Sequence, residues 1–341
     1  MRQAGELFKK NKTWLIVGLI LVLCVLPLFA KPTVTRVLTV TCIYCISTFG
    51  LMLIFGMAGM MCTGYAAFLG VGAYITAILS KTYGVPFGLC ILASAFGTAI
   101  VGFIVCLPIL RLTVDFVGMI TTAFLYIFVA VLKNWQDVTG GAVGIYAILR
   151  PTFFNYTMID KKEQFYLIFA LTILSYWLVN NLLHSKIGRS MKGIRDNEIG
   201  TTAIGIKAPQ MKLLTFAVGC FFAGVAGSLY AAYMGVVTPD NFTFAISTTF
   251  LQMCVIGGIG TLPGAIIGTA FITIFPEVVR PLATYRLGIA GVIMVLLMVF
   301  RPQGLAGSRA YAGDRGVLDR IQQRLAVKKA NKPQKPGSAV L

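Results

Sequence analysis

The sequence predicts an all-α membrane protein, and three observations support this fold class. Hydrophobic residues make up 57% of the 341 residues and charged residues only 12%, which is too little charge to cover a water-soluble domain. Apolar stretches recur along the chain, each close to the roughly 20 residues that span a bilayer as a helix. The alternating segments of roughly ten residues that mark a membrane β-barrel do not occur. Because the backbone must satisfy its own hydrogen bonds in hydrocarbon, we expect about ten transmembrane helices.

The apolar stretches divide the chain into spans and connections. We expect a transmembrane domain over residues 1–306 and a basic, partly disordered tail over residues 307–341. The first stretch is longer than the apolar core of a signal peptide, so we interpret it as a retained helix. An even number of spans places both termini on one side of the membrane. The expected spans cover residues 13–30, 34–55, 65–80, 86–110, 116–132, 163–183, 211–234, 246–256, 263–275 and 285–300.

The net charge of +18 indicates membrane orientation rather than nucleic-acid binding. The basic residues gather in short segments beside apolar spans, as the positive-inside rule describes for cytoplasmic segments. We therefore expect contact with membrane lipid, no nucleic-acid partner, and both termini in the cytoplasm. The basic segments are the N-terminus (Arg2, Lys9, Lys10, Lys12), a central segment (Lys186, Arg189, Lys192, Arg195, Lys207, Lys212) and the tail after Arg301.

Glycine-rich breaks interrupt the expected spans in two places. One is FGMAGMMCTGYAAFLGVGAY, around the third span, and the other is VIGGIGTLPGAIIG, between the eighth and ninth. Broken helices at membrane depth occur where they pack inside protein or line a cavity, and transporters use them at substrate sites. Close helix packing through small residues explains the same pattern equally well. The similarity of GVGAYITAIL to GAIIGTAFITIF suggests an internal pseudo-repeat. The candidates for a substrate route are Thr63, Gly64, Tyr65, Gly257 and Gly258.

The central segment, residues 184–210, is long for a connection between helices. Asp196 or Asn197 can cap a short helix, and Gly205 and Pro209 can end it. The apolar residues Ile199, Ala203 and Ile206 would then share one face of that helix. An amphipathic helix without a span of its own must dock on the membrane surface or in the groove of a partner protein.

Motifs along most of the chain resemble one family of transporters. The stretch from Glu198 to Ile206 looks like the coupling loop of ATP-binding-cassette (ABC) importer permeases. Around it, GRSMKGIRDNE and KLLTFAVGCFFAGVAGSLYA are similar to the branched-chain amino-acid permease family, in its longer subunit type. The other matches, in family order, are GYAAFLGVGAY, DFVGMITTAFLYI, TGGAVGI, VTPDNFTF, VIGGIGTLPGAIIG and RPQGL.

This resemblance implies the pore subunit of an ATP-driven importer in the bacterial cytoplasmic (inner) membrane. Its implied partners are a second, homologous permease subunit, two ATP-binding subunits that hold ATP and Mg, and an extracytoplasmic substrate-binding protein. No cofactor is then expected on this chain. The coupling loop carries over onto Arg195, Glu198, Gly200, Ala203 and Gly205, with Glu198 expected to pair with a basic residue of the ATPase unless it lies on a solvated face.

The chain departs from the family pattern in two places. Gly200 and Thr201 stand where the family more often has alanines, and Tyr65 stands where relatives commonly have His or Gln. The second departure bears on the substrate, because that position belongs to the candidate route.

A further candidate site lies in the expected external segments. Thr139, Gly140 and Gly141 follow the fifth span, and Asp240 precedes the eighth. We expect them to frame the external mouth or to meet the binding protein. The alternatives are a plain turn at the two glycines and a helix cap at Asp240.

The motifs that the sequence lacks distinguish between the remaining candidate functions. No P-loop is present, so ATP hydrolysis needs another subunit. No Ser/His, paired-Asp or HExxH arrangement supports an enzyme, and Cys42 and Cys45 have no second cluster or His partner that would suggest a metal site. The spans hold almost no acidic or basic residues, which disfavours an ion-coupled secondary carrier without excluding it. An ABC permease for urea or another small solute is the other alternative.

Overall fold

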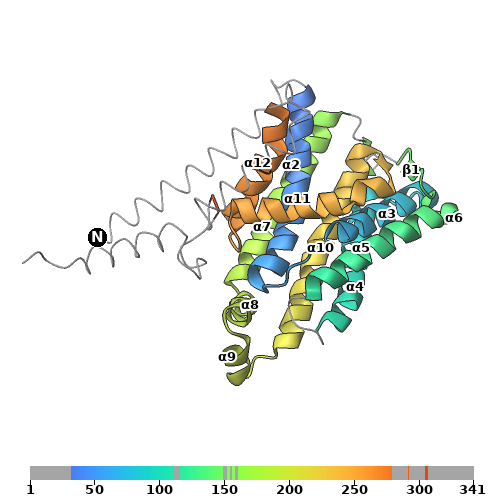
Figure 1. Cartoon of the computed structure of the whole chain (residues 1–341). Helices are drawn as coiled ribbons and strands as arrows, with labels where there is room; N and C mark the ends of the chain where they lie inside the picture. Colours follow the sequence, from blue (N-terminus) through green and yellow to red (C-terminus); the bar gives the residue numbers. More distant parts are fainter. Residues whose placement is uncertain are drawn as a thin grey trace, which may run out of the picture.

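The computed structural model describes residues 32–110, 116–148, 160–278, 291 and 304–305, together with the strand residues 152–153 and 156–157. Helices of two directions cross in one bundle (Figure 1). The expected span 13–30, the tail 307–341 and, apart from residue 291, the expected span 285–300 lie outside the described residues. The bounds of the helices are α2 Pro32–Leu51, η1 Met52–Met57, α3 Ala66–Tyr83, α4 Phe87–Ile109, α5 Phe116–Asn134, α6 Gln136–Thr139, α7 Lys161–His184, α8 Lys186–Asp196, α9 Glu198–Ala203, α10 Ala208–Met234, η2 Pro239–Phe242, α11 Phe244–Gly257 and α12 Leu262–Val278.

The other eight expected spans each fall on a helix, but the count of ten is not established. Five helices of the described residues are long and apolar enough to cross a membrane: Pro32–Met57, Phe87–Ile109, Phe116–Asn134, Lys161–His184 and Ala208–Met234. Large apolar side chains on α4, α5 and α7 face outward, including Phe96, Ile100, Met119, Ile127 and Trp177. Because such a surface is unfavourable in water, the structure supports a multi-pass membrane protein.

The centre of the bundle is a contact between the backbones of α3, α4 and α10. A Cβ atom at Gly72 would come within 2.7 Å of the Cα of Gly224. Ser94 on α4 bridges the same two turns, with its hydroxyl 2.9 Å from the oxygen of Gly72 and 2.7 Å from that of Gly224. Small residues at a helix interface permit this approach, as in other membrane bundles.

The helices α11 and α12 form a pair that is packed through glycines. α11 has 14 residues, about 21 Å at 1.5 Å per residue, so it is shorter than the hydrocarbon core. A Cβ at Gly264 would come within 2.8 Å of the oxygen of Gly258, and one at Gly268 within 2.7 Å of the nitrogen of Gly257. The expected interruption is therefore confirmed at Gly257–Thr261. The two segments proposed as a pseudo-repeat begin in α3 and α12, each after a glycine-rich break, and the repeat remains a prediction.

Short strands, which the sequence did not predict, close the end of the bundle where α10 finishes. β1 (Ile145–Tyr146) pairs antiparallel with β4 (Val236–Val237), and β2 (Thr152–Phe153) pairs with β3 (Tyr156–Thr157). Strands of two residues carry too little pattern to be found in a sequence. This end, called the β1 end below, is separated by the length of α10 from the α8–α9 segment (Figure 1).

The central glycine contact predicts a large difference between two similar substitutions. Gly72→Ala should lower the melting temperature of the detergent-purified protein, because overpacking against the backbone of α10 costs about 1–3 kcal/mol. Gly97→Ala on α4 should leave it unchanged or raise it, since the added methyl meets only the terminal Cδ1 of Ile75. Equal melting temperatures for the two variants would contradict the packing described here.

Candidate coupling and transport site

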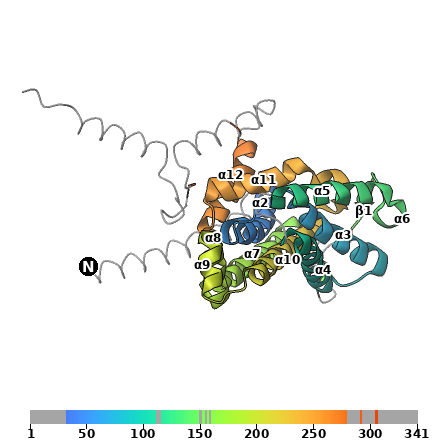
Figure 2. The same ribbon diagram turned by 60° about the horizontal axis from the view of Figure 1, so that its bottom comes forward.

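The α8–α9 segment stands at one end of the bundle, between α7 and α10 (Figure 1; Figure 2 brings this end forward). The expected short helix exists as α9, and its cap is Asn197, whose side-chain oxygen accepts the Gly200 N–H at 2.9 Å. Asp196 is instead the last residue of α8, a helix that lies where the sequence predicts only a connection. Ser185 caps α8 by accepting the Gly188 N–H.

The apolar side chains in α9 and directly after it point away from the rest of the protein. Ile199 is 85% exposed and Ile204 77% exposed, and Ala203 is exposed between them. The prediction that Ile199, Ala203 and Ile206 share one face of the helix is therefore wrong for Ile206. The helix ends at Ala203, and Gly205 turns the chain with a φ of +89°, so Ile204 is presented and Ile206 is partly buried.

Two charged residues of this segment bind within the chain. Both oxygens of Glu198 accept from the Lys212 ammonium, at 2.7 and 2.8 Å. The expected basic partner of Glu198 is thus supplied by α10 in this structure. Arg195 extends its guanidinium to η1, where Nη1 donates to the Gly56 carbonyl at 2.6 Å. The other three residues predicted for coupling are exposed: Gly200 and Ala203 in α9, and Gly205 just after it.

The break after η1 is held against α5. The Thr63 hydroxyl lies 2.7 Å from the Gly118 oxygen and 2.6 Å from the Thr122 hydroxyl. Gly64 approaches α5 so closely that a Cβ there would overlap the Thr121 carbonyl. The glycine at this position is therefore required by packing, whatever further role the break has.

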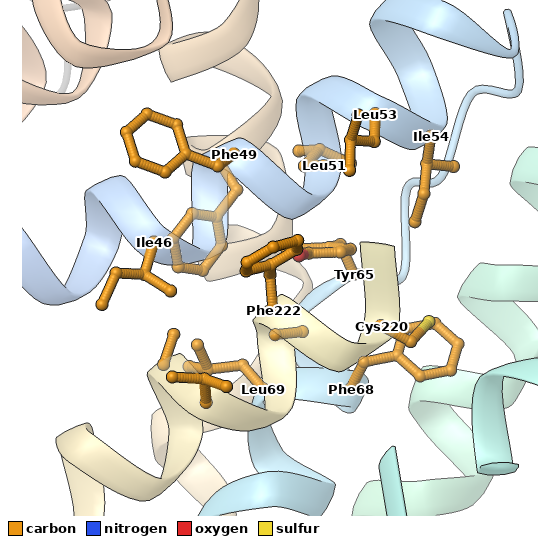
Figure 3. Close-up of a cluster of buried hydrophobic side chains, with 14 of the residues drawn as sticks. Ile46, Phe49, Leu51, Leu53, Ile54, Tyr65, Phe68, Leu69, Cys220 and Phe222 are labelled. Carbon is orange, nitrogen blue, oxygen red and sulfur yellow. The ribbon is translucent and has the colours of Figure 1, made fainter. Parts of the chain in front are cut away.

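Tyr65, the next residue, is fully buried. Its hydroxyl donates to the backbone oxygen of Ser47 on α2 at 2.8 Å and lies 3.2 Å from that of Gly219 on α10. Figure 3 shows the ring beside Phe222, within a cluster formed by α2, η1, α3 and α10. In this conformation Tyr65 joins helices and does not face an open route.

Gly257 and Gly258, the other predicted route residues, lie at the turn between α11 and α12. Gly258 has a φ of +123°, which disfavours any other residue. The turn meets the first break through Gly56, where a Cβ would come within 2.7 Å of the Gly260 nitrogen. The structure thus joins the two glycine-rich breaks at Gly56 and Gly260, whereas Thr63 and Tyr65 contact α5, α2 and α10.

At the β1 end, the four predicted residues lie close together but differ in exposure. Thr139 is buried, and its hydroxyl bonds the oxygens of Leu132 and Trp135. Gly140 and Gly141 turn the chain with φ values of +73° and +60°. Asp240 forms a 2.9 Å ion pair with Lys133. It lies within η2, whose N-cap is Thr238, and the N-cap of α11 is Thr243, so the expectation that Asp240 caps a helix is wrong.

Sequence reasoning missed the side chains that this end exposes. Trp135, Val138, Val143 and Tyr146 are all exposed apolar residues. The sequence signal for them is an excess of large apolar residues in a segment that connects two spans. No group of three potential metal ligands among His, Cys, Asp and Glu occurs in the described part of the chain.

The role of Tyr65 can be tested against a second buried tyrosine. Tyr65→Phe should destabilise the protein by about 1 kcal/mol, the typical net value of a hydrogen bond. Tyr74→Phe should be neutral or stabilising, because the buried Tyr74 hydroxyl has no hydrogen-bond partner in the described residues. Melting temperatures in detergent measure both effects. A Tyr65→Phe protein as stable as the wild type would refute the joining role of the hydroxyl.

Comparison with known proteins agrees with this architecture. Residues 33–301 match the model of the family described as "Branched-chain amino acid transport system / permease component". The chain is 33% identical over 319 residues to the high-affinity branched-chain amino acid transport system permease protein LivM of Escherichia coli K12, covering 87% of this chain and 75% of the relative. No solved structure matches the chain significantly.

More distant relatives include both named types of permease. The probable LivM protein of Methanocaldococcus jannaschii is 26% identical over 75% of this chain and 78% of its own length. The LivH permease protein of E. coli K12 is 24% identical over 77% of this chain and 91% of its own length. The greater similarity to LivM agrees with the longer subunit type that the motifs indicated. The chain therefore belongs to the branched-chain amino acid permease family of ABC transporters, whose members are membrane-spanning transport subunits.

Proposed function

We propose that this chain is the pore subunit of an ABC importer that moves branched-chain amino acids into the cell. The observation that carries the proposal is α9, a short capped helix between two membrane-spanning helices, with Ile199 exposed in its first turn and Ile204 exposed directly after its end. Exposed isoleucines beside an ordered bundle are the expected feature of a segment that docks in a partner's groove. The partner proposed here is an ATPase subunit.

The energy for import would come from two such ATPase subunits, which hold the ATP and Mg. The chain contains no P-loop that could bind a nucleotide itself. Closure of the ATPases would move the α8–α9 segment together with the bundle, the rigid-body motion by which transporters alternate access. No cofactor on this chain is required for that motion.

Charge supports a cytoplasmic position for the α8–α9 segment. The exposed Lys186 and Arg189 and the partly exposed Lys192 lie on α8, where the positive-inside rule places basic residues. The membrane would be the cytoplasmic (inner) membrane of a bacterium, and both termini would lie in the cytoplasm. The β1 end would then face outward.

Two further partners complete the proposed assembly. Relatives of this chain include permease proteins named LivM and LivH, and we propose a homologous permease as the second half of the pore. An extracytoplasmic binding protein would meet the β1 end, where Trp135 and Tyr146 are exposed and Asp240 is held by Lys133. The contact with the binding protein follows from the orientation proposed above.

The test is purification of the tagged chain from native membranes, followed by assays of bound ATPase and of uptake. Wild type should retain ATPase subunits and support uptake of leucine, isoleucine or valine rather than urea. Ile199→Asp should reduce ATPase retention by on the order of tenfold or more, because a central apolar contact residue typically contributes about 2 kcal/mol.

The matched control is Ser190→Asp, on an exposed part of α8. It introduces the same carboxylate into the same segment and should retain the ATPase and uptake. A stable wild-type chain that carries no ATPase, or an Ile199→Asp variant that retains it fully, would refute the docking proposal. An ion-coupled carrier would then be the leading alternative.

A further inference from the structure

We propose that Arg195 is a positioning residue that joins the α8–α9 segment to the two glycine-rich breaks of the membrane helices. The observation is the 2.6 Å hydrogen bond from its Nη1 to the Gly56 carbonyl, between residues 139 positions apart. The inference rests on the proposed function and deepens it. It gives Arg195 a role inside the permease, whereas the coupling-loop resemblance alone would place it against the ATPase.

The Gly56 carbonyl is a group that needs such a donor. Gly56 is the penultimate residue of η1, and the last carbonyls of a helix lack partners within the helix. The residue is buried, so an unbonded carbonyl there would be costly. A cation at this position also interacts favourably with the negative end of the helix dipole. Arg195 therefore caps the C-terminus of the continuous helix Pro32–Met57.

The capped turn connects directly with the second break. A Cβ at Gly56 would come within 2.7 Å of the nitrogen and 2.8 Å of the Cα of Gly260. Arg195 also packs along the first break, since its Cγ would lie 3.5 Å from a Cβ at Gly59. Gly59 and Gly260 have φ values of +70° and +79°, so both backbones adopt conformations that are strained for other residues. A displacement of Arg195 therefore acts on both breaks at once.

On its other side, Arg195 is connected with the surface proposed to meet the ATPase. The Asn197 N–H donates to the Gly193 oxygen at 2.9 Å, and the Thr201 hydroxyl donates to the Asn197 oxygen at 2.8 Å. Thr201 is buried against Gly193 of α8. These contacts hold α8 and α9 as one unit, so a force on Ile199 reaches Arg195 through packed backbone. The physical chain of contacts thus runs from α9 through α8 to η1 and the α11–α12 turn.

The experiment uses the intact transporter complex in proteoliposomes and compares ATP hydrolysis with solute uptake. Arg195→Gln should retain the ATPase subunits and hydrolyse ATP, while uptake per ATP falls on the order of tenfold, within the range of couplings between two sites. Arg195→Lys, which keeps a cationic donor, should lose less. Arg189→Gln is the control, because Arg189 lies on the same helix with its side chain exposed.

Each other outcome contradicts a defined part of the proposal. Wild-type coupling in Arg195→Gln overturns the positioning role and leaves the proposed function intact. Loss of the ATPase subunits from Arg195→Gln, with retention in Arg189→Gln, means that Arg195 contacts the ATPase instead. A wild-type chain that binds no ATPase overturns the proposed function and this inference together.

A second measurement follows the break itself. Met61 lies in the first break and is 50% exposed, so Met61→Cys can be labelled with a water-soluble thiol reagent, and the parent protein serves as the background control. The labelling rate should change when ATP is added to the complex, and adding Arg195→Gln should abolish that change. The proposed link between Arg195 and the break would be overturned if ATP left the labelling rate unchanged in the wild-type background. An equal change of that rate in Arg195→Gln would overturn it too.

Discussion

Where a helix is interrupted inside a membrane protein, its last backbone carbonyls have no water from which to accept a hydrogen bond. This constraint explains where the helices of this chain can be interrupted. At each glycine-rich break, one backbone carbonyl accepts a hydrogen bond from a residue that is remote in sequence. Arg195 donates to Gly56, and the Leu305 N–H donates to the Ile256 oxygen at 2.8 Å. The second contact brings the end of the RPQGL motif back to the α11–α12 turn. The breaks are therefore built parts of the bundle, held by donors that are remote in sequence.

The rest of the bundle provides a rigid body around these breaks. Gly72 and Gly224 let α3 and α10 touch, and Ser94 fixes α4 to both. Against this packed centre, the exposed isoleucines of α9 and the exposed apolar residues of the β1 end stand out as surfaces for partners. One molecule thus combines a closely packed core, two glycine-rich breaks that are held by hydrogen bonds, and exposed apolar side chains at opposite ends of α10. This is the arrangement that the proposed ATP-driven import requires.

The sequence predicted the helices well because apolar runs and glycine breaks are local signals. It also limited the α9 cap to Asp196 or Asn197, and the structure has Asn197 in that role. It missed α8, whose basic residues resembled a solvated connection, and the two-residue strands. The partners of Glu198, Arg195 and Asp240 could not be predicted from the sequence. These residues pair with Lys212, Gly56 and Lys133, and such pairings depend on how distant helices are brought together.

The proposed import depends on the binding of α9 to an ATPase subunit. The most direct measurement is to replace Ile199 by a photoreactive amino acid in cells, irradiate native membranes, and identify the adduct by mass spectrometry. We expect a cross-link to an ATP-binding subunit from position 199, and none to that subunit from the same probe at Tyr146 of the β1 end. Adducts with lipid alone at position 199, or the same ATPase adduct from position 146, would contradict it.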